Sequence, residues 1–96
     1  MILTTVGARS GKVRKVALMR VSCQGGYVPI GSMGGQPQDP DWVHNVRAHP
    51  AVTVREVLAD ERSRCWSQAL AVFARYDEYQ ARTERTIPVF LAEAVF

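Results

Sequence analysis

Short runs of β-branched and apolar residues dominate the first third of the chain. Residues 2–5 and 13–22 form two such runs, and residues 27–31 resume the extended pattern after a glycine-rich turn at 24–26. Two extended runs on either side of such a turn are typical of a β-hairpin. Pro29 cannot donate a hydrogen bond to a neighbouring strand, so we expect its strand to lie at a sheet edge or to carry a bulge there.

Apolar positions take up helical spacing further along the chain. Asp39 followed by Pro40 predicts the N-cap and the first position of a short helix, which runs through Trp42 to about residue 48. His49 ends this helix, since a residue before proline avoids helical geometry. Asp60 is expected to cap a second helix. The apolar stripe of that helix follows a period of about 3.6 residues, at Cys65, Trp66, Ala69, Leu70 and Phe73.

The remaining segments complete a mixed pattern. A further short helix is expected to begin at Tyr76, and extended segments are expected at 51–57 and 87–91. Residues 32–40 form a loop by their glycine and proline content. No internal repeat or low-complexity stretch interrupts the sequence. We therefore predict one α+β domain over residues 1–96, built around a small antiparallel barrel or sheet.

Size and composition narrow the class of protein. A chain of 96 residues is enough for one domain with a small core. Its composition, 47% hydrophobic and 22% charged, excludes a disordered tail. No apolar run approaches the roughly 20 residues that span a bilayer, and the first residues lack a signal-peptide pattern. We therefore expect a soluble cytoplasmic protein.

The net charge of +3 is distributed unevenly. All nine acidic residues lie from Asp39 onward, whereas the charged residues in 1–38 are all cations. These cations are Arg9, Lys12, Arg14, Lys15 and Arg20. Such asymmetry points to an anionic partner for the basic part, and arginine suits phosphate because its planar fork donates two parallel hydrogen bonds. Nucleic acid is the alternative partner, but no run of five or more basic residues supports it.

The two cysteines carry no recognisable metal or redox motif. Cys23 and Cys65 are 42 positions apart without a C-x-x-C pattern. His44 and His49 are five positions apart, which does not place them on one helical face. We expect two buried free thiols and no metal site.

Residues 4–14 are the densest group of candidate site residues. Two glycines, hydroxyl side chains and three cations lie there between two expected strands. A glycine-rich turn would let backbone N–H groups converge on an anion, while Arg9, Lys12 and Arg14 neutralise it. The segment is not a P-loop, which needs four residues between its glycines and Ser or Thr after its lysine. An exposed hairpin turn with solvated cations is the alternative interpretation.

Two further groups of residues could line a ligand site. The small residues of 31–35 would let a flat ligand approach the backbone, although an ordinary loop has the same composition. Trp42, Phe73, Tyr76 and Tyr79 could wall a pocket with two phenols as hydrogen-bond donors, although aromatic residues at helical spacing also build cores. The chain has no G-x-S-x-G motif, so hydrolysis by that route is unsupported.

Taken together, these segments resemble the deazaflavin-dependent nitroreductase and quinone reductase family. Leu3-Thr4-Thr5-Val6-Gly7, Ser10-Gly11 and Arg14 are similar to its LTTxGrkSGxxR signature. Residues 32–35 are similar to its SKGG loop. Further matches follow in the same order at Pro40-x-Trp42-x-x-Asn45, Ala48-His49-Pro50-x-Val52-x-Val54, Glu61-Arg62…Trp66, Tyr76-x-x-Tyr79-Gln80 and Arg85-x-Ile87-Pro88-Val89. The resemblance covers nearly the whole chain.

The resemblance implies a fold, a cofactor and a reaction. The fold is a split β-barrel of the flavin-reductase and pyridoxamine-oxidase kind with short flanking helices. The cofactor is coenzyme F-420, an 8-hydroxy-5-deazaflavin, whose reduced ring would pass a hydride to a quinone or nitro-aromatic acceptor. FMN is the alternative cofactor, and a non-catalytic deazaflavin- or flavin-binding protein of the same fold is the alternative function.

The resemblance also implies roles for individual residues. The catalytic residues would be Tyr76, Tyr79 and Ser32, whose hydroxyls would orient the acceptor or pass a proton. Coenzyme binding falls to Arg9, Ser10, Gly11, Lys12, Arg14, Ser32, Met33, Gly34, Gly35 and Trp42.

The chain departs from the family pattern in ways that carry expectations. Ala8 and Met33 stand where the family has basic residues, which should weaken coenzyme binding. The leading helical segment of the family is missing, and residues 52–55 run almost directly into 56–60, where relatives have a turn and another strand. A lost strand exposes sheet edges, so we expect either a homodimer, strand-swapped or not, or a compressed variant with decayed activity. The resemblance further implies a quinone or nitro acceptor as partner, no nucleic acid, and peripheral contact with the cytoplasmic face of a membrane.

Overall fold

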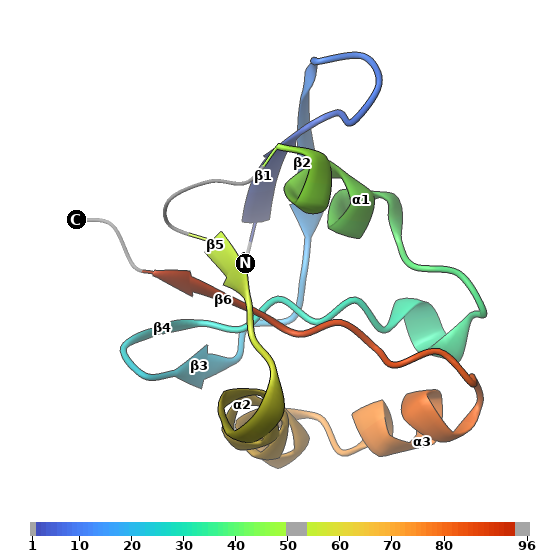
Figure 1. The fold of residues 1–96 in the computed structure, drawn as a ribbon. Helices are drawn as coiled ribbons and strands as arrows, with labels where there is room; N and C mark the ends of the chain where they lie inside the picture. Colours follow the sequence, from blue (N-terminus) through green and yellow to red (C-terminus); the bar gives the residue numbers. More distant parts are fainter. Residues whose placement is uncertain (1, 50–53, 94–96) are drawn as a thin grey trace.

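The computed structural model describes residues 2–49 and 54–93 (Figure 1). The helices in this part of the chain are α1 (Asp41–Ala48), α2 (Ala59–Val72) and α3 (Arg75–Ala81), with a 3₁₀ turn η1 (Met33–Gly35). The strands are β1 (Ile2–Val6), β2 (Val13–Ala17), β3 (Ser22–Cys23), β4 (Gly26–Tyr27), β5 (Val54–Glu56) and β6 (Phe90–Glu93). The expected mixture of helices and antiparallel strands is confirmed.

The first two strands form a hairpin of their own. β1 pairs with β2 from Ile2 opposite Ala17 to Val6 opposite Val13. Residues of β1 alternate between exposed and buried, as expected for a sheet with one solvated face. The inward-facing Leu3 packs in a cluster with Trp42, Val43, Val46 and Phe90, which places the hairpin against α1 (Figure 1).

The remaining strands form a second sheet in the order β3-β4-β6-β5. β6 pairs with β4 on one side and with β5 on the other, so the last described strand lies inside the sheet. α2 and α3 cover one side of this sheet, and the hairpin with α1 lies on the other (Figure 1). The larger core cluster fills the space beneath the sheet with Val21, Val28, Ile30, Val57, Cys65, Ala69, Tyr76, Ile87, Val89 and Leu91.

Apart from β1, which extends to Val6, the strands are shorter than their sequence pattern predicts. The run 13–22 is divided into β2 and β3, and the run 27–31 contributes only its first residue to β4. Pro29 is therefore neither in an edge strand nor at a bulge: β4 is paired on both sides and ends before it. Its carbonyl accepts a hydrogen bond from the Phe90 N–H at 3.0 Å. β6 begins after Pro88 rather than at 87, and part of the expected strand 51–57, at 51–53, lies outside the described residues.

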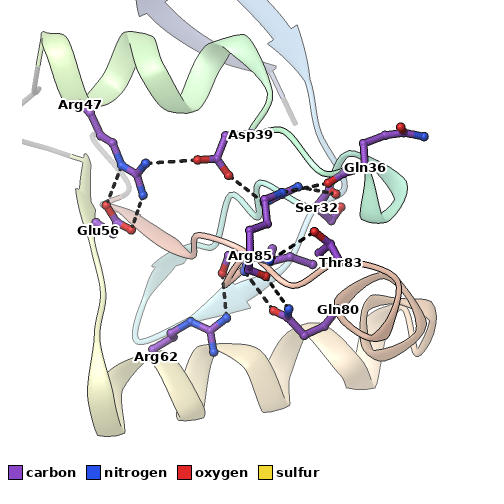
Figure 2. Close-up of polar contacts among 10 residues, drawn as sticks. Ser32, Gln36, Asp39, Arg47, Glu56, Arg62, Gln80, Thr83 and Arg85 are labelled. Carbon is purple, nitrogen blue, oxygen red and sulfur yellow. Dashed lines mark hydrogen bonds and ion pairs between the residues drawn. The ribbon is translucent and has the colours of Figure 1, made fainter.

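Both predicted helix caps are wrong. Pro40, not Asp39, is the N-cap of α1, and no side chain caps this helix. The Asp39 carboxylate instead accepts hydrogen bonds from Arg47 and Arg85 (Figure 2). α2 begins one residue before Asp60, with Leu58 as its N-cap. Both oxygens of the Asp39 carboxylate are thus hydrogen-bonded to guanidinium groups, which are strong, charge-assisted bonds.

The apolar stripe of α2 packs as expected. Cys65 and Ala69 are buried, and Trp66, Leu70 and Phe73 pack against the same cluster. None of the described helices has the length and apolar character needed to cross a membrane.

The two cysteines lie side by side as free thiols, one on β3 and one on α2. The Cys65 Sγ donates to the Cys23 Sγ at 3.4 Å. Cys65 is buried and Cys23 is half-buried, so the expectation of two buried thiols is correct for Cys65 alone. Burial, together with the hydrogen bond to Cys23, raises the pKa of the Cys65 thiol to about 12.

We therefore expect iodoacetamide to label Cys23 alone in the native protein. At about pH 8 a thiol with so high a pKa contributes almost no thiolate, which is the nucleophile. Mass spectrometry of the alkylated protein should show one adduct in buffer and two in urea. The variant Cys23→Ser should take up no label until it is unfolded. Equal labelling rates at both cysteines in the native state would contradict the burial of Cys65.

Candidate functional site

A cavity of about 860 Å³ lies between the β1–β2 hairpin and α1. Arg9, Ser10 and Arg14 line it from the hairpin, and Trp42 and Asn45 line it from the helix. Three of the predicted coenzyme-binding residues from the basic segment are thus brought together with the predicted Trp42. Gly11 and Lys12 belong to the same turn but are not among the lining residues.

The electrostatics of this cavity favour an anion. Its lining residues include the cations Arg9, Arg14 and Lys15, whereas Asp41 is the acid among them. Within the described residues, no ion pair joins any of these three cations to a carboxylate. Their charge is therefore available to a ligand.

The hairpin turn uses its backbone amides within the molecule. The Gly7 N–H donates to the Lys12 carbonyl at 2.7 Å, and the Gly11 N–H donates to the Gly7 carbonyl at 3.0 Å. The Lys12 N–H donates to the Ser10 hydroxyl at 3.2 Å. Gly11 takes a φ of +69°, which a glycine adopts without strain. These three amides are therefore engaged within the turn and do not converge on a common point outside it.

Asn45 fixes the hairpin on α1. Its Oδ1 accepts a hydrogen bond from the Ala8 N–H at 2.9 Å, and its Nδ2 donates to the Thr5 hydroxyl at 3.3 Å. The side chain is buried, so both of its ends need partners. No role was predicted for this residue, although it stands three positions after Trp42 and so shares a helix face with it.

A second cavity, of about 290 Å³, adjoins the first. Val16, Pro40 and Trp42 line both. Its other walls include Ser32, Met33 and Tyr76, so four predicted site residues meet here when Trp42 is counted. Trp42 separates a cationic chamber from a small chamber with an apolar and aromatic lining.

The two predicted tyrosines take different positions. Tyr76 is buried, with its ring centroid 5.2 Å from that of Phe73 and 6.3 Å from that of Tyr79. Burial, and then the nearby Tyr79, raise the pKa of the Tyr76 phenol above its usual value, so it remains protonated and able to donate a hydrogen bond at neutral pH. Tyr79 lines neither cavity, and the Arg82 guanidinium lies 5.7 Å from its ring centroid.

Gly34 and Gly35 also stand outside the two cavity linings. Gly35 packs against α3: a Cβ at this position would lie 2.7 Å from the Tyr79 carbonyl oxygen. Close contact with α3 therefore explains this glycine. Among the described residues, no group of three or more His, Cys, Asp and Glu side chains is placed to hold a metal ion.

Comparison with known proteins identifies the family. Residues 1–94 match the model of the F420H(2)-dependent quinone reductase family. An F420H(2)-dependent quinone reductase of Mycobacterium tuberculosis is 32% identical over 103 residues, which cover 93% of this chain and 69% of that protein.

Two solved structures are similar in both sequence and shape. One, described as an F420-H2 dependent reductase, has a TM-score of 0.84 and is 41% identical in sequence. The match covers 96% of this chain and 92% of the other. Another, described as a domain-swapped dimer, has a TM-score of 0.87 and 41% identity over 96% of this chain and 78% of its own. The chain belongs to the F420H(2)-dependent quinone reductase family.

Proposed function

We propose that this chain binds coenzyme F-420 across the two adjoining cavities and directs its hydride to a quinone. The observation that carries the proposal is the division at Trp42 between a cationic chamber and a small aromatic one. An elongated cofactor with an anionic end and a flat end needs both.

The donor set of the larger cavity fits the anionic end of the coenzyme. A phosphodiester and a carboxylate tail need cations whose charge is not already neutralised. Arg9 and Arg14 can each donate two parallel hydrogen bonds to phosphate, and Lys15 adds a point charge. The Ser10 hydroxyl on the same turn adds a neutral donor.

The smaller cavity fits the flat end and the acceptor. Trp42 and Tyr76 contribute aromatic side chains to its lining, which also includes Ser32 and Met33. When bound, the reduced deazaflavin supplies the hydride, so the chain itself needs no strongly basic or metal group. Its residues would orient the reactants and exclude water, and the protonated phenol of Tyr76, which lines this cavity, would donate a hydrogen bond to an acceptor oxygen.

We further infer a split barrel assembled from the two sheets, with β5 leading directly into α2 through Val57 and Leu58. This short connection supports the inference that a barrel strand is missing. A homodimer would cover the exposed apolar side chains on the hairpin, where Ile2 and Val13 are each 64% exposed. The domain-swapped dimer among the similar structures supports the same assembly. Nitro-aromatic acceptors, FMN as an alternative cofactor and contact with a membrane surface stay predictions.

The test is titration of coenzyme F-420 with the folded protein, sized beforehand by gel filtration. We expect the fluorescence of the deazaflavin to be quenched on binding, and the reduced coenzyme to be consumed when menadione is added as a quinone. FMN titrated in parallel serves as the matched control for cofactor choice. Absence of quenching at high micromolar coenzyme would contradict the proposal. Binding without menadione reduction would instead select the non-catalytic alternative.

A further inference from the structure

The loop at residues 32–36 has a backbone that needs outside support. Met33, Gly34 and Gly35 have successive φ angles of +46°, +63° and +80°. This region is strained for Met33 because of its Cβ, and such a residue keeps that conformation only where its surroundings enforce it. The Gly35 N–H donates to the Ser32 carbonyl at 2.9 Å and the Gln36 N–H donates to the Met33 carbonyl at 3.2 Å. These bonds close the turn but do not place it in the molecule.

The guanidinium of Arg85 holds both ends of this loop (Figure 2). Its Nη2 donates to the Ser32 carbonyl at 3.0 Å, and its Nε donates to the Gln36 carbonyl at 2.9 Å. Its Nη1 donates to the Asp39 carboxylate at 2.8 Å. The side chain is 14% exposed, so water competes little for these bonds. A planar fork can make all three bonds in fixed directions, which a lysine ammonium cannot.

Arg85 is itself held in place from two sides. The Gln80 side chain of α3 donates to the Arg85 carbonyl at 2.8 Å and accepts from the Ile87 N–H at 3.0 Å. The other oxygen of Asp39 accepts from Arg47 of α1 at 3.2 Å (Figure 2). Arg85 is therefore fixed to α3 through its backbone and, through Asp39, to Arg47 of α1.

The position of the loop decides the shape of the smaller cavity. Ser32 and Met33 line that cavity, and Gly35 rests against the Tyr79 backbone behind it. The described residues that line the two cavities do not include Arg85. Arg85 therefore acts on the cavity only through the loop that it holds.

We propose that Arg85 is a positioning residue for the deazaflavin ring. Its bonds to the Ser32 and Gln36 carbonyls hold the loop in the conformation that forms one wall of the ring site. The inference rests on the proposed function, which assigns the ring to the smaller cavity. It assigns Arg85 to the shape of the ring site, whereas the cations of the larger cavity hold the phosphate end.

The test compares Arg85→Lys with a matched control at Arg47. Arg85→Lys keeps the charge beside Asp39 but lacks the separate guanidinium nitrogens that bond the two loop carbonyls. We expect its affinity for the phosphate-free 8-hydroxy-5-deazariboflavin, measured by fluorescence quenching, to fall at least about tenfold. Arg47→Gln removes the other arginine from Asp39 and leaves both loop bonds intact. The affinity of this variant for the phosphate-free deazaflavin should stay within about twofold of the wild type, because exposed ion pairs contribute little free energy.

Two further measurements separate positioning from a general loss of structure. In the first, inorganic phosphate competes with the whole coenzyme for binding. Arg85→Lys should keep the wild-type affinity for phosphate, because Arg9 and Arg14 are unchanged. In the second, Asp39→Asn should weaken binding of the phosphate-free deazaflavin by a smaller factor than Arg85→Lys does. This variant tests the proposal if Arg85→Lys does not fold.

Wild-type affinity for the phosphate-free deazaflavin in folded Arg85→Lys would overturn the proposal. An equal loss in Arg47→Gln would overturn it as well. Failure of the wild-type protein to bind the coenzyme would instead overturn the proposed function.

Discussion

Trp42→Ala is expected to remove about 3–5 kcal/mol from the free energy of unfolding. The indole is 5% exposed and meets the Phe90 ring edge-on, with the ring centroids 5.3 Å apart. It also packs with Leu3, Val43 and Val46, so its removal leaves a cavity at the contact between the hairpin, α1 and the second sheet. Small domains have a total stability of only about 5–15 kcal/mol. The variant should therefore be close to unfolding at room temperature.

Urea denaturation followed by the fluorescence of Trp66 measures this loss, because that second tryptophan lies in the other core cluster. Trp42→Phe is the matched control: it keeps an aromatic ring against Phe90 and should cost less than about half as much. Loss of stability below about 1 kcal/mol in Trp42→Ala would show that the smaller cluster closes around the gap. Because Trp42 lines both cavities, Trp42→Phe should also weaken coenzyme binding without unfolding the chain.

Arg14→Ala should weaken coenzyme binding by roughly 10- to 100-fold while leaving the melting temperature nearly unchanged. A hydrogen bond to a charged group contributes about 1.5–3 kcal/mol, and each 1.4 kcal/mol is about tenfold in affinity. Arg14 is exposed on β2 and lines the larger cavity, so its removal exposes no core. Substitutions at such positions usually change stability by less than about 0.5 kcal/mol.

Lys12→Ala is the matched control for Arg14→Ala. Lys12 is an exposed cation of the same turn, but it does not line the cavity. Its removal should change the affinity for the coenzyme far less than that of Arg14. Arg14→Ala should also keep its affinity for the phosphate-free deazaflavin, which is the reverse of the pattern expected for Arg85→Lys. A drop in stability that matches the drop in affinity would give Arg14 a structural role instead.

Local sequence patterns were sufficient to predict the elements that depend on neighbouring residues. The extended run that became β1 and the apolar stripe of α2 were both predicted, and each has one face packed on a core. Asp39 shows where local rules fail. Its position before Pro40 is typical of an N-cap, but Arg85 lies 46 residues away in sequence and bonds its carboxylate. No local pattern contains that partner.

The candidate site was predicted as a set of residues but not as an arrangement. Arg9, Ser10, Arg14 and Trp42 share a cavity because Asn45 joins the hairpin to α1 across 37 to 40 positions of sequence. Lys12 and Gly11 carry the same motif but stand outside the lining, since the turn directs neighbouring residues to different sides. Tyr79 lies behind the loop because Gly35 packs on its backbone. Helical spacing alone could not distinguish it from Tyr76.

The hairpin of β1 and β2 has no ladder of hydrogen bonds to the four-stranded sheet within the described residues. It is held by the small apolar cluster around Leu3 and by the two hydrogen bonds of Asn45. Segments fixed by few buried contacts open at a lower free energy than the whole domain unfolds. We therefore expect the hairpin to detach from α1 at a lower free energy than the whole domain unfolds, and its detachment would uncover the cationic chamber. A bulky, tailed ligand could enter from the side during such an opening, without threading its tail past Trp42.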